Sequence, residues 1–292
     1  MNRTRIAHGL LKSIRIPTEY LRPAAGGSIS SDVTNRLQMK RPQITPQHIG
    51  IVGCSAEGAA LCYRTICIEG EALMGPFGHP EVSMHTPPLS AYMDCLERGD
   101  WTGVADLMLA SANKLAEMGA DFLICPDNTI HQALPQVLPR SPLSWLHIAE
   151  VVAEHSVQRG FRRLGLTGTR WLVDGPVYPD VFNTRGLGLV RPTDAERDAI
   201  DRIIFEELTR GKIRPASVAY FQKVIGRMSH DNCDAIVLGC TEIPLLISDE
   251  NSPLPTLDST RLLARAALRR AVNSQIARVT DPYRLAKTLQ SW

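Results

Sequence analysis

Two short apolar stretches repeat one another along the chain. The first runs from Asp121 to Asp127 and the second from Asp234 to Cys240, and the same offset in numbering relates both ends. In each stretch an Asp precedes an unbroken apolar run, which ends in small or turn-forming and then polar residues. An unbroken run of this length predicts a strand that is buried on both faces, as in a parallel sheet covered by helices.

The rest of the apolar pattern predicts further strands that alternate with helices. Strands are expected at 48–53, 79–85, 161–168 and 234–239. Helices are expected over 88–119, divided near Gly99, with a core-facing stripe of Met108, Leu109, Ala112, Leu115 and Met118. Thr193 and Glu196 have the spacing of a capping box at the start of another helix, which Gly211 ends.

Two copies of one unit predict an α/β protein with two related halves. Ligands of open α/β sheets bind at the carboxyl ends of the strands, so Asp127 and Cys240 are expected to face each other across one cleft. We expect a first domain at 47–145 and 253–275, because the stretch 254–260 and the helix rich in Ala, Arg and Leu after it return to the first half. A second domain is expected at 146–252 and a C-terminal tail at 276–292.

Residues 1–46 are predicted to be an extension, either flexible or reflecting a misassigned start. Up to Arg41 this segment carries eight basic residues against only Glu19 and Asp32. The alternatives are an arm that packs on a partner subunit and a transit peptide, although the Arg-rich start lacks a clear amphipathic continuation.

The composition is that of an ordinary soluble globular protein. Hydrophobic residues make up 44% and charged residues 21%, with a net charge of +2, so neither a nucleic-acid nor a membrane partner is expected. Seven cysteines without a CxxC pair predict free thiols in a reducing, cytoplasmic compartment. Five of them are expected to be small core or near-surface residues, namely Cys54, Cys62, Cys67, Cys95 and Cys233.

Cys240 and Asp127 are the candidate catalytic residues. A thiolate at a helix N-terminus has a depressed pKa and can act as a nucleophile or proton acceptor near neutral pH. Asp127 is either the acid or base opposite Cys240 or only the N-cap of the following helix, and Thr241 is expected to cap the helix after Cys240. His131, four residues past Asp127, either reaches the cleft or covers the helix surface.

The turn after the first strand, residues 53–58, is a candidate site for a carboxylate. It lacks the Lys of a P-loop and the glycine spacing of a dinucleotide fingerprint. Backbone amides at a helix start are suited to holding a carboxylate, and the Ser55 hydroxyl is expected to face the cleft with them.

From about residue 48 to 272, the chain resembles the cofactor-independent aspartate/glutamate racemase superfamily, which also contains hydantoin racemase, maleate isomerase and arylmalonate decarboxylase. The most specific matching motif is Gly-Cys-Thr-Glu at 239–242. The other matching stretches are 49–58, 79–83, 126–131, 165–169 and 207–211.

The resemblance implies two pseudo-symmetric three-layer α/β domains with mainly parallel sheets and an active site in the cleft between them. In the family's racemases a cysteine from each half flanks the substrate α-carbon, and one removes a proton while the other supplies one, with neither pyridoxal phosphate nor a metal. A small carboxylate or amino acid is the implied substrate, and a homodimer the implied assembly. The predicted substrate-binding residues are Ser55, Asn128, Thr129, His131, Thr169, Thr241 and Glu242.

The chain departs from the racemase pattern at Asp127, where the family has its first cysteine. Cys125 lies two residues earlier inside the strand, so its side chain should point away from the exit point. No Lys or Arg stands where relatives that act on dicarboxylates hold the distal carboxylate. Arg170 and His85 are the nearest candidates, so the resemblance does not settle aspartate or glutamate as the substrate.

Three functions remain open at this point. The favoured one is an amino-acid racemase or epimerase that uses Cys240 and Asp127 as an unequal pair, because the rest of the pattern follows the amino-acid racemases. The second is a single-cysteine decarboxylase, cis–trans isomerase or lyase of a small carboxylic acid. The third is a non-catalytic binding protein in which Asp127 is only a helix cap.

Overall fold

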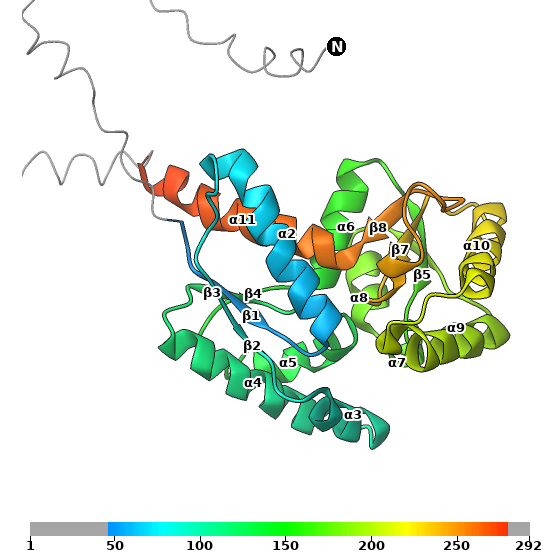
Figure 1. Cartoon of the computed structure of the whole chain (residues 1–292), viewed down its shortest axis with the longest axis horizontal. Coiled ribbons are helices and arrows are strands. Elements are labelled where there is room, and N and C mark those ends of the chain that lie inside the picture. Colours follow the sequence, from blue (N-terminus) through cyan, green and yellow to red (C-terminus); the bar gives the residue numbers. More distant parts are fainter. Residues whose placement is uncertain (1–45, 280–292) are drawn as a thin grey trace, which may run out of the picture. The chain divides into compact units, whose positions relative to one another are not determined.

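The computed structural model describes residues 46–279, which form two α/β halves (Figure 1). The first half contains β1 (Ile49–Val52), α2 (Ala56–Met74), β2 (Val82–His85), α3 (Leu89–Glu97), α4 (Trp101–Glu117), β3 (Phe122–Ile124), the 3₁₀ helix η2 (Thr129–Ala133), α5 (Leu134–Val137) and β4 (Trp145–Leu146). Then follow α6 (Ile148–Gln158), β5 (Arg163–Thr167), α7 (Arg170–Asp174), α8 (Val177–Thr184), β6 (Gly188–Val190), α9 (Asp194–Glu206), η3 (Leu208–Arg210), α10 (Pro215–His230), β7 (Ala235–Leu238), η4 (Ile243–Leu245), β8 (Thr256–Asp258) and α11 (Ser259–Val279).

Each half is built on a four-stranded parallel sheet, and the two sheets have the same topology. The strand order is β2-β1-β3-β4 in the first and β6-β5-β7-β8 in the second. The predicted strands of the sequence repeat, β3 and β7, therefore hold the same place in the two sheets. All residues of both strands are buried, as expected for strands that are covered on both faces.

The repeated Asp residues join each of these strands to its neighbour. The Asp121 carboxylate, before β3, accepts a hydrogen bond from the backbone N–H of His48, before β1. The Asp234 carboxylate, before β7, accepts from the backbone N–H groups of Arg162 and Arg163 at the start of β5. Both carboxylates thus satisfy amides at the amino end of the sheet, which fixes the start of the neighbouring strand.

Helices cover both faces of each sheet and make three layers (Figure 1). In the first half α2 and α11 pack on one face, and α3, α4 and α5 pack on the other. In the second half α6, α7 and α8 cover one face, and α9 and α10 cover the other. The predicted α/β class with two related halves is therefore confirmed. No helix within residues 46–279 is long and apolar enough to cross a membrane.

Several predicted boundaries need correction. The strand at Thr256–Asp258 pairs with β7, so the chain returns to the first half at Ser259 and not at residue 253. Residues 145 and 146 form β4, an edge strand of the first sheet, and helix α11 continues to Val279, which places the start of the predicted tail inside a helix. The rest of the tail and residues 1–45 lie outside the described residues.

The helical predictions mostly hold. Two helices separated near Gly99 and the capping box of Thr193 and Glu196 are present. Gly211 has a left-handed conformation, but it ends the short η3 rather than α9 itself. Met118 is 57% exposed and is not part of the core stripe, because it lies just past the end of α4.

Candidate active site

The carboxyl ends of β1, β3, β5 and β7 meet around a small cavity between the two halves. The first half contributes Cys54, Ser55, Leu89, Met93, Leu96, Asp127 and Thr129 to its lining. The second half contributes Thr169, Trp171, Ile204, Phe205, Thr209, Cys240 and Glu242. Polar side chains at the strand ends thus face an apolar wall that comes from helices α3, α7 and α9.

A chain of hydrogen bonds crosses from the first half to Cys240. The backbone N–H of Gly58 donates to Ser55 Oγ at 3.2 Å, and Ser55 Oγ contacts Thr241 Oγ1 at 3.1 Å. Thr241 Oγ1 and Cys240 Sγ both donate to Glu242 Oε2, at 2.6 and 2.9 Å. Because Thr241 uses its proton for Glu242, the Ser55 hydroxyl donates to Thr241. The start of α2 is therefore linked to the Cys240 thiol.

A second pair of hydroxyl groups joins the halves near Asp127. Thr129 Oγ1 lies 3.1 Å from Thr169 Oγ1. Thr169 is the N-cap residue of α7, as Ser55 is the N-cap residue of α2. In both places a helix-capping hydroxyl after the first strand of one sheet meets a threonine from the other half, which reflects the pseudo-symmetry of the fold.

Asp127 lies beside Cys54, which follows the neighbouring strand β1. The Cys54 thiol donates a hydrogen bond to the Asp127 carboxylate, and the backbone N–H groups of Thr129 and Ile130 also interact with it. Burial raises the pKa of Asp127 to about 6, and the charge of Glu242 adds to the rise, while the three hydrogen bonds oppose it. Asp127 therefore both holds the start of η2 and remains mostly ionised, as a potential base, at neutral pH.

Cys240 has the opposite protonation state to the one predicted from the sequence. Burial raises the pKa of the Cys240 thiol well above its ordinary value, and the nearby charges of Glu242 and Asp127 raise it further. The predicted depression by a helix N-terminus is absent because the helix that follows, η4, has only three residues. The site at rest therefore holds a protonated thiol on one side and a carboxylate on the other.

The cavity brings together six of the predicted site residues and leaves three behind its wall. Ser55, Asp127, Thr129, Thr169, Cys240 and Glu242 line it, whereas Asn128, His131 and Thr241 do not. Thr241 does not cap a helix as predicted, because its hydroxyl serves Glu242.

Asn128 and His131 hold the framework behind the cavity. The Asn128 amide donates to Ser259 Oγ at 2.9 Å and accepts from the Tyr178 hydroxyl at 2.7 Å, which fastens it to the start of α11 and to α8. His131 Nδ1 donates to the backbone oxygen of Asp127 and its Nε2 accepts from the backbone N–H of Ile148. Burial lowers the pKa of His131 well below its ordinary value, so the ring is neutral and supports the Asp127 backbone.

Sequence reasoning missed Cys54 and the apolar wall. Cys54 was expected to be a small core or near-surface residue; it is indeed buried in the core of the first half, but it also lines the cavity next to Asp127. The two cationic candidates for a distal carboxylate lie elsewhere: His85 interacts with Ser111 and Lys114, and Arg170 stacks over the Trp171 ring. Neither belongs to the cavity lining.

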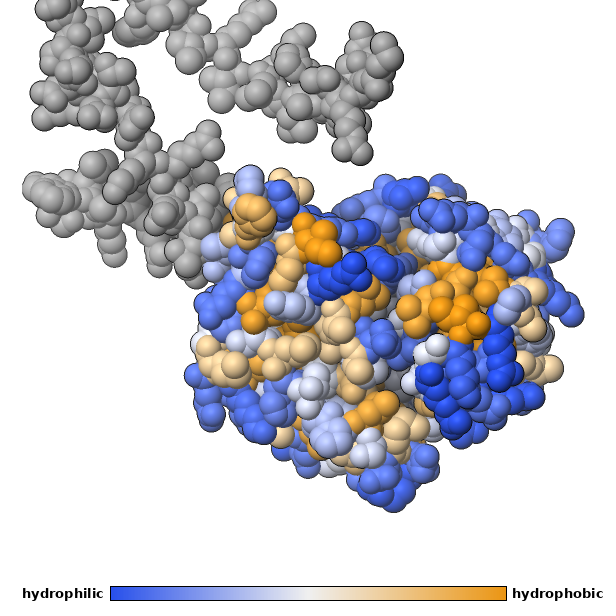
Figure 2. Space-filling view, viewed as in Figure 1, coloured by the Kyte–Doolittle hydropathy of each residue, from blue (hydrophilic) through white to orange (hydrophobic). Residues whose placement is uncertain are grey.

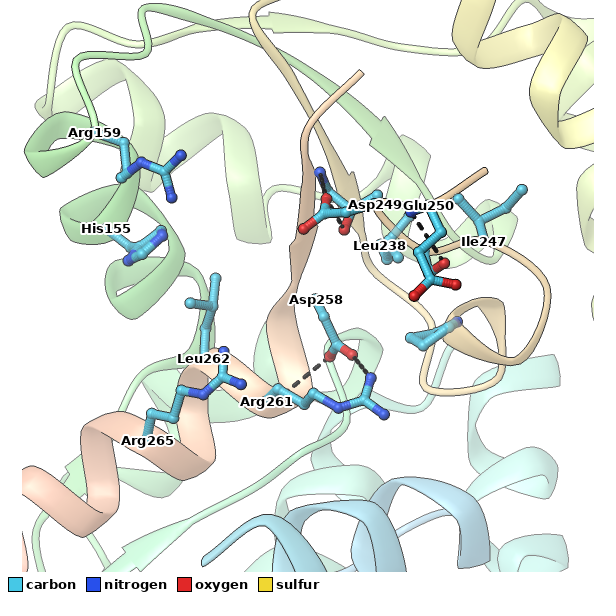
Figure 3. A pocket seen from close by; sticks show the side chains of 13 residues that line it. His155, Arg159, Leu238, Ile247, Asp249, Glu250, Asp258, Arg261, Leu262 and Arg265 are labelled. Carbon is cyan, nitrogen blue, oxygen red and sulfur yellow. Dashed lines mark hydrogen bonds and ion pairs between the residues drawn. The ribbon is translucent and has the colours of Figure 1, made fainter. Parts of the chain in front are cut away.

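A larger cavity of about 510 Å³ lies where β8 passes into α11 (Figure 3). Its charged side chains come from α6, the loop before β8 and α11, and several are already paired. Arg261 forms an ion pair with Asp258, and Arg265 donates two hydrogen bonds to Glu69 on α2. It contains none of the predicted site residues, so it is not the candidate active site. Within residues 46–279, no group of three His, Cys, Asp or Glu residues is arranged to hold a metal ion.

Comparison with known proteins gives a consistent result. The family model described as Asp/Glu/hydantoin racemase matches residues 50–267. The broad-specificity amino-acid racemase RacX of Bacillus subtilis is 21% identical over 190 residues, which is 65% of this chain and 81% of RacX.

Two crystal structures cover 77% of this chain and 99% of their own. A candidate Asp/Glu racemase from Yersinia pestis is 29% identical with a TM-score of 0.72. PH1733, an aspartate racemase homologue from Pyrococcus horikoshii, is 25% identical with a TM-score of 0.68.

Gly58 provides a test of the contact between the halves. A Cβ at this position would lie 2.5 Å from Thr241 Cγ2 and 3.0 Å from Ser55 Oγ. We expect Gly58→Ala to lower the free energy of unfolding by about 1–3 kcal/mol, as overpacking usually does, and to lower activity through Thr241. The matched control is Gly226→Ala inside α10, where nothing lies within 4 Å of the new Cβ. Denaturant unfolding should show the control to be stabilised by about 0.5–1 kcal/mol, and equal effects of the two substitutions would contradict the close contact.

Proposed function

The chain belongs to the Asp/Glu/hydantoin racemase family and is an amino-acid racemase, and we propose that Asp127 and Cys240 exchange protons with opposite faces of the substrate α-carbon. The observation that carries this proposal is that a carboxylate and a thiol from opposite halves line one cavity. The proposed reaction uses side chains alone and no cofactor.

The resting protonation states assign the two roles in one direction of the reaction. The ionised Asp127 takes the α-proton, and the electron pair of the broken C–H bond passes into an enediolate of the substrate carboxylate. Cys240 then gives its S–H proton to the opposite face of the α-carbon and is left as a thiolate. In the reverse direction the thiolate takes the proton and the protonated Asp127 supplies one. Positioned acid–base groups of this kind contribute about 10²–10⁴-fold to a rate.

The polar rim of the cavity suits the substrate carboxylate. The hydroxyl groups of Ser55, Thr129 and Thr169 line it, and Ser55 is also the N-cap of α2, a helix of 19 residues. The N-terminus of a helix favours negative charge, and it stabilises an enediolate more than the less charged carboxylate from which it forms. Glu242 interacts with Cys240 and Thr241. We therefore propose that it acts on the Cys240 thiol, rather than binding the substrate as the sequence predicts.

We propose further that the substrate side chain is uncharged and apolar. The wall of the cavity is formed by Leu89, Met93, Leu96, Trp171, Ile204 and Phe205. No Lys or Arg belongs to the described lining, and two carboxylates, Asp127 and Glu242, do. A second carboxylate on the substrate would be desolvated without a partner and repelled by both groups, which disfavours aspartate and glutamate.

A homodimer and a cytoplasmic location are also proposed. Apolar side chains are exposed at the C-terminal end of α2, where Leu73 is 52% and Phe77 95% accessible, and Figure 2 shows apolar groups among hydrophilic ones there. Exposed apolar groups of this kind support self-association. All seven cysteines are free thiols, which supports a reducing compartment.

Proton NMR in D₂O tests the acid–base chemistry directly. With both enantiomers of a panel of amino acids, the active protein should remove the α-proton signal while the opposite enantiomer appears. Cys240→Ser should lower this rate at least about 100-fold, because a hydroxyl is a far weaker acid than a thiol. The matched control is Cys233→Ser, a buried thiol just before the amino end of the same strand, which should keep the wild-type rate. Wild-type protein that exchanges no α-proton, or a Cys240→Ser variant with more than a tenth of the rate, would refute the proposal.

The same assay tests the class of substrate. Leucine and aspartate have similar shapes and differ mainly in charge, so their ratio of kcat/KM isolates the effect of the distal carboxylate. We expect leucine to be favoured at least about 100-fold, since an unpaired buried charge costs several kcal/mol. Aspartate or glutamate turning over as fast as leucine would show that a cation reaches the cavity during turnover and would exclude the apolar assignment.

A further inference from the structure

We infer that Cys54 is a positioning residue whose thiol holds Asp127 in place as the base of the first half. This inference rests on the proposed function and adds a residue to it. After β3 the first half has Asp127 at the position where the resemblance places the family's first cysteine, and its cavity-lining thiol, Cys54, lies one strand away, after β1.

Cys54 and Asp127 follow two paired strands, β1 and β3, and both line the cavity. Cys54 is only 5% exposed, while Asp127 is partly exposed to the cavity. The Cys54 thiol donates to the Asp127 carboxylate. Asp127 is thus the outer group that meets the substrate, and Cys54 is the inner group that orients it.

The second half shows the same arrangement with the two chemical groups exchanged. There the thiol of Cys240 is the outer, partly exposed group. Its inner partner is the Glu242 carboxylate, which is 5% exposed and accepts the thiol proton in a hydrogen bond of 2.9 Å. Each half therefore presents one thiol–carboxylate pair, with the carboxylate outside in the first half and the thiol outside in the second.

The two inner partners have opposite effects on the outer groups. A donor beside a carboxylate stabilises its charged form, so Cys54 lowers the pKa of Asp127 against the rise caused by burial. A carboxylate beside a thiol stabilises the neutral form, so Glu242 raises the pKa of Cys240. The inner pair therefore fixes which outer group is the base and which is the acid.

Other titratable groups also face Asp127 and must be considered in any pH effect. The charge of Glu242 acts on Asp127, and the charge of Asp127 acts on further groups from three elements, namely Cys125, Tyr92 and Cys240. Burial raises the pKa of each of these three well above its ordinary value, so they stay protonated over the range in which Asp127 titrates. Among the side chains close to Asp127, Cys54 is the one that donates to its carboxylate.

The pH dependence of racemisation separates this role from simple packing. Wild-type kcat/KM should rise with pH through about 6 as Asp127 loses its proton. In Cys54→Ala the lost hydrogen bond should move this rise upward by about one unit, which gives about a tenfold lower rate in acid and a nearly unchanged rate on the alkaline plateau. Cys54→Ser should restore the wild-type profile, because a hydroxyl also donates. Cys62→Ala, which removes a fully buried thiol outside the cavity, should leave the profile unchanged.

A titration without substrate keeps the test independent of turnover. The ¹³C signal of the Asp127 carboxyl, identified by its loss in Asp127→Asn, should titrate about one unit higher in Cys54→Ala than in the wild type. Cys54→Val, which fills the space without a donor, should behave like Cys54→Ala and replaces it if that variant does not fold. An unchanged titration in both variants, or a uniform loss of rate at every pH that Ser does not rescue, would overturn the inference. Absence of exchange in the wild type would instead refute the proposed function, while the titration would still decide the role of Cys54.

Discussion

The chain of hydrogen bonds from Gly58 through Ser55 and Thr241 to Glu242 is the interaction on which the arrangement of the site depends. Buried polar groups must be partnered, and the bond between Ser55 and Thr241, which joins the two parts of this chain, forms only if the two halves meet in one register. Cys240 donates to the last carboxylate of the chain. The same contacts therefore set the packing of the halves and the protonation of the Cys240 thiol. A change at the start of α2 should alter the hydrogen bonding of Cys240 through Thr241 and Glu242.

The second constraint is that two carboxylates, Asp127 and Glu242, line the same cavity. Burial and the charge of Glu242 both raise the pKa of Asp127. Three donors oppose this rise, one from Cys54 and two from the backbone, while Glu242 accepts hydrogen bonds from Cys240 and Thr241. The Asp127 carboxylate therefore keeps its charge at neutral pH, and the Cys240 thiol remains neutral.

The sequence predicts the frame of this site better than its interior. The repeat can be recognised in the sequence because Asp121 and Asp234 each stand directly before a strand and each accept a hydrogen bond from the start of the neighbouring strand. The pairing of β8 was not predictable, because a three-residue strand carries no signal that tells which sheet it joins. Cys54 was missed since a cysteine after a buried strand looks the same whether it faces core or cavity. Helical periodicity likewise predicts which face of α9 is apolar, but it does not tell that Ile204 on this face lines the cavity as well as the core.

An aspartate opposite a cysteine has a consequence that two cysteines would not have. Enantiomers have equal free energies, so kcat/KM must be the same in both directions whatever the two groups are. The asymmetry lies instead in the free enzyme, since one direction leaves a protonated Asp127 and a Cys240 thiolate, a state that burial and the charge of Glu242 disfavour. After that direction, the free energy falls as the enzyme returns to its resting protonation state. Before the opposite direction, the enzyme must first form the state with a protonated Asp127 and a Cys240 thiolate, which costs free energy. The difference between Asp127 and Cys240 therefore makes kcat and KM differ between the two directions, although their ratio does not. The difference arises in the step that restores the protons, because both directions share one chemical transition state.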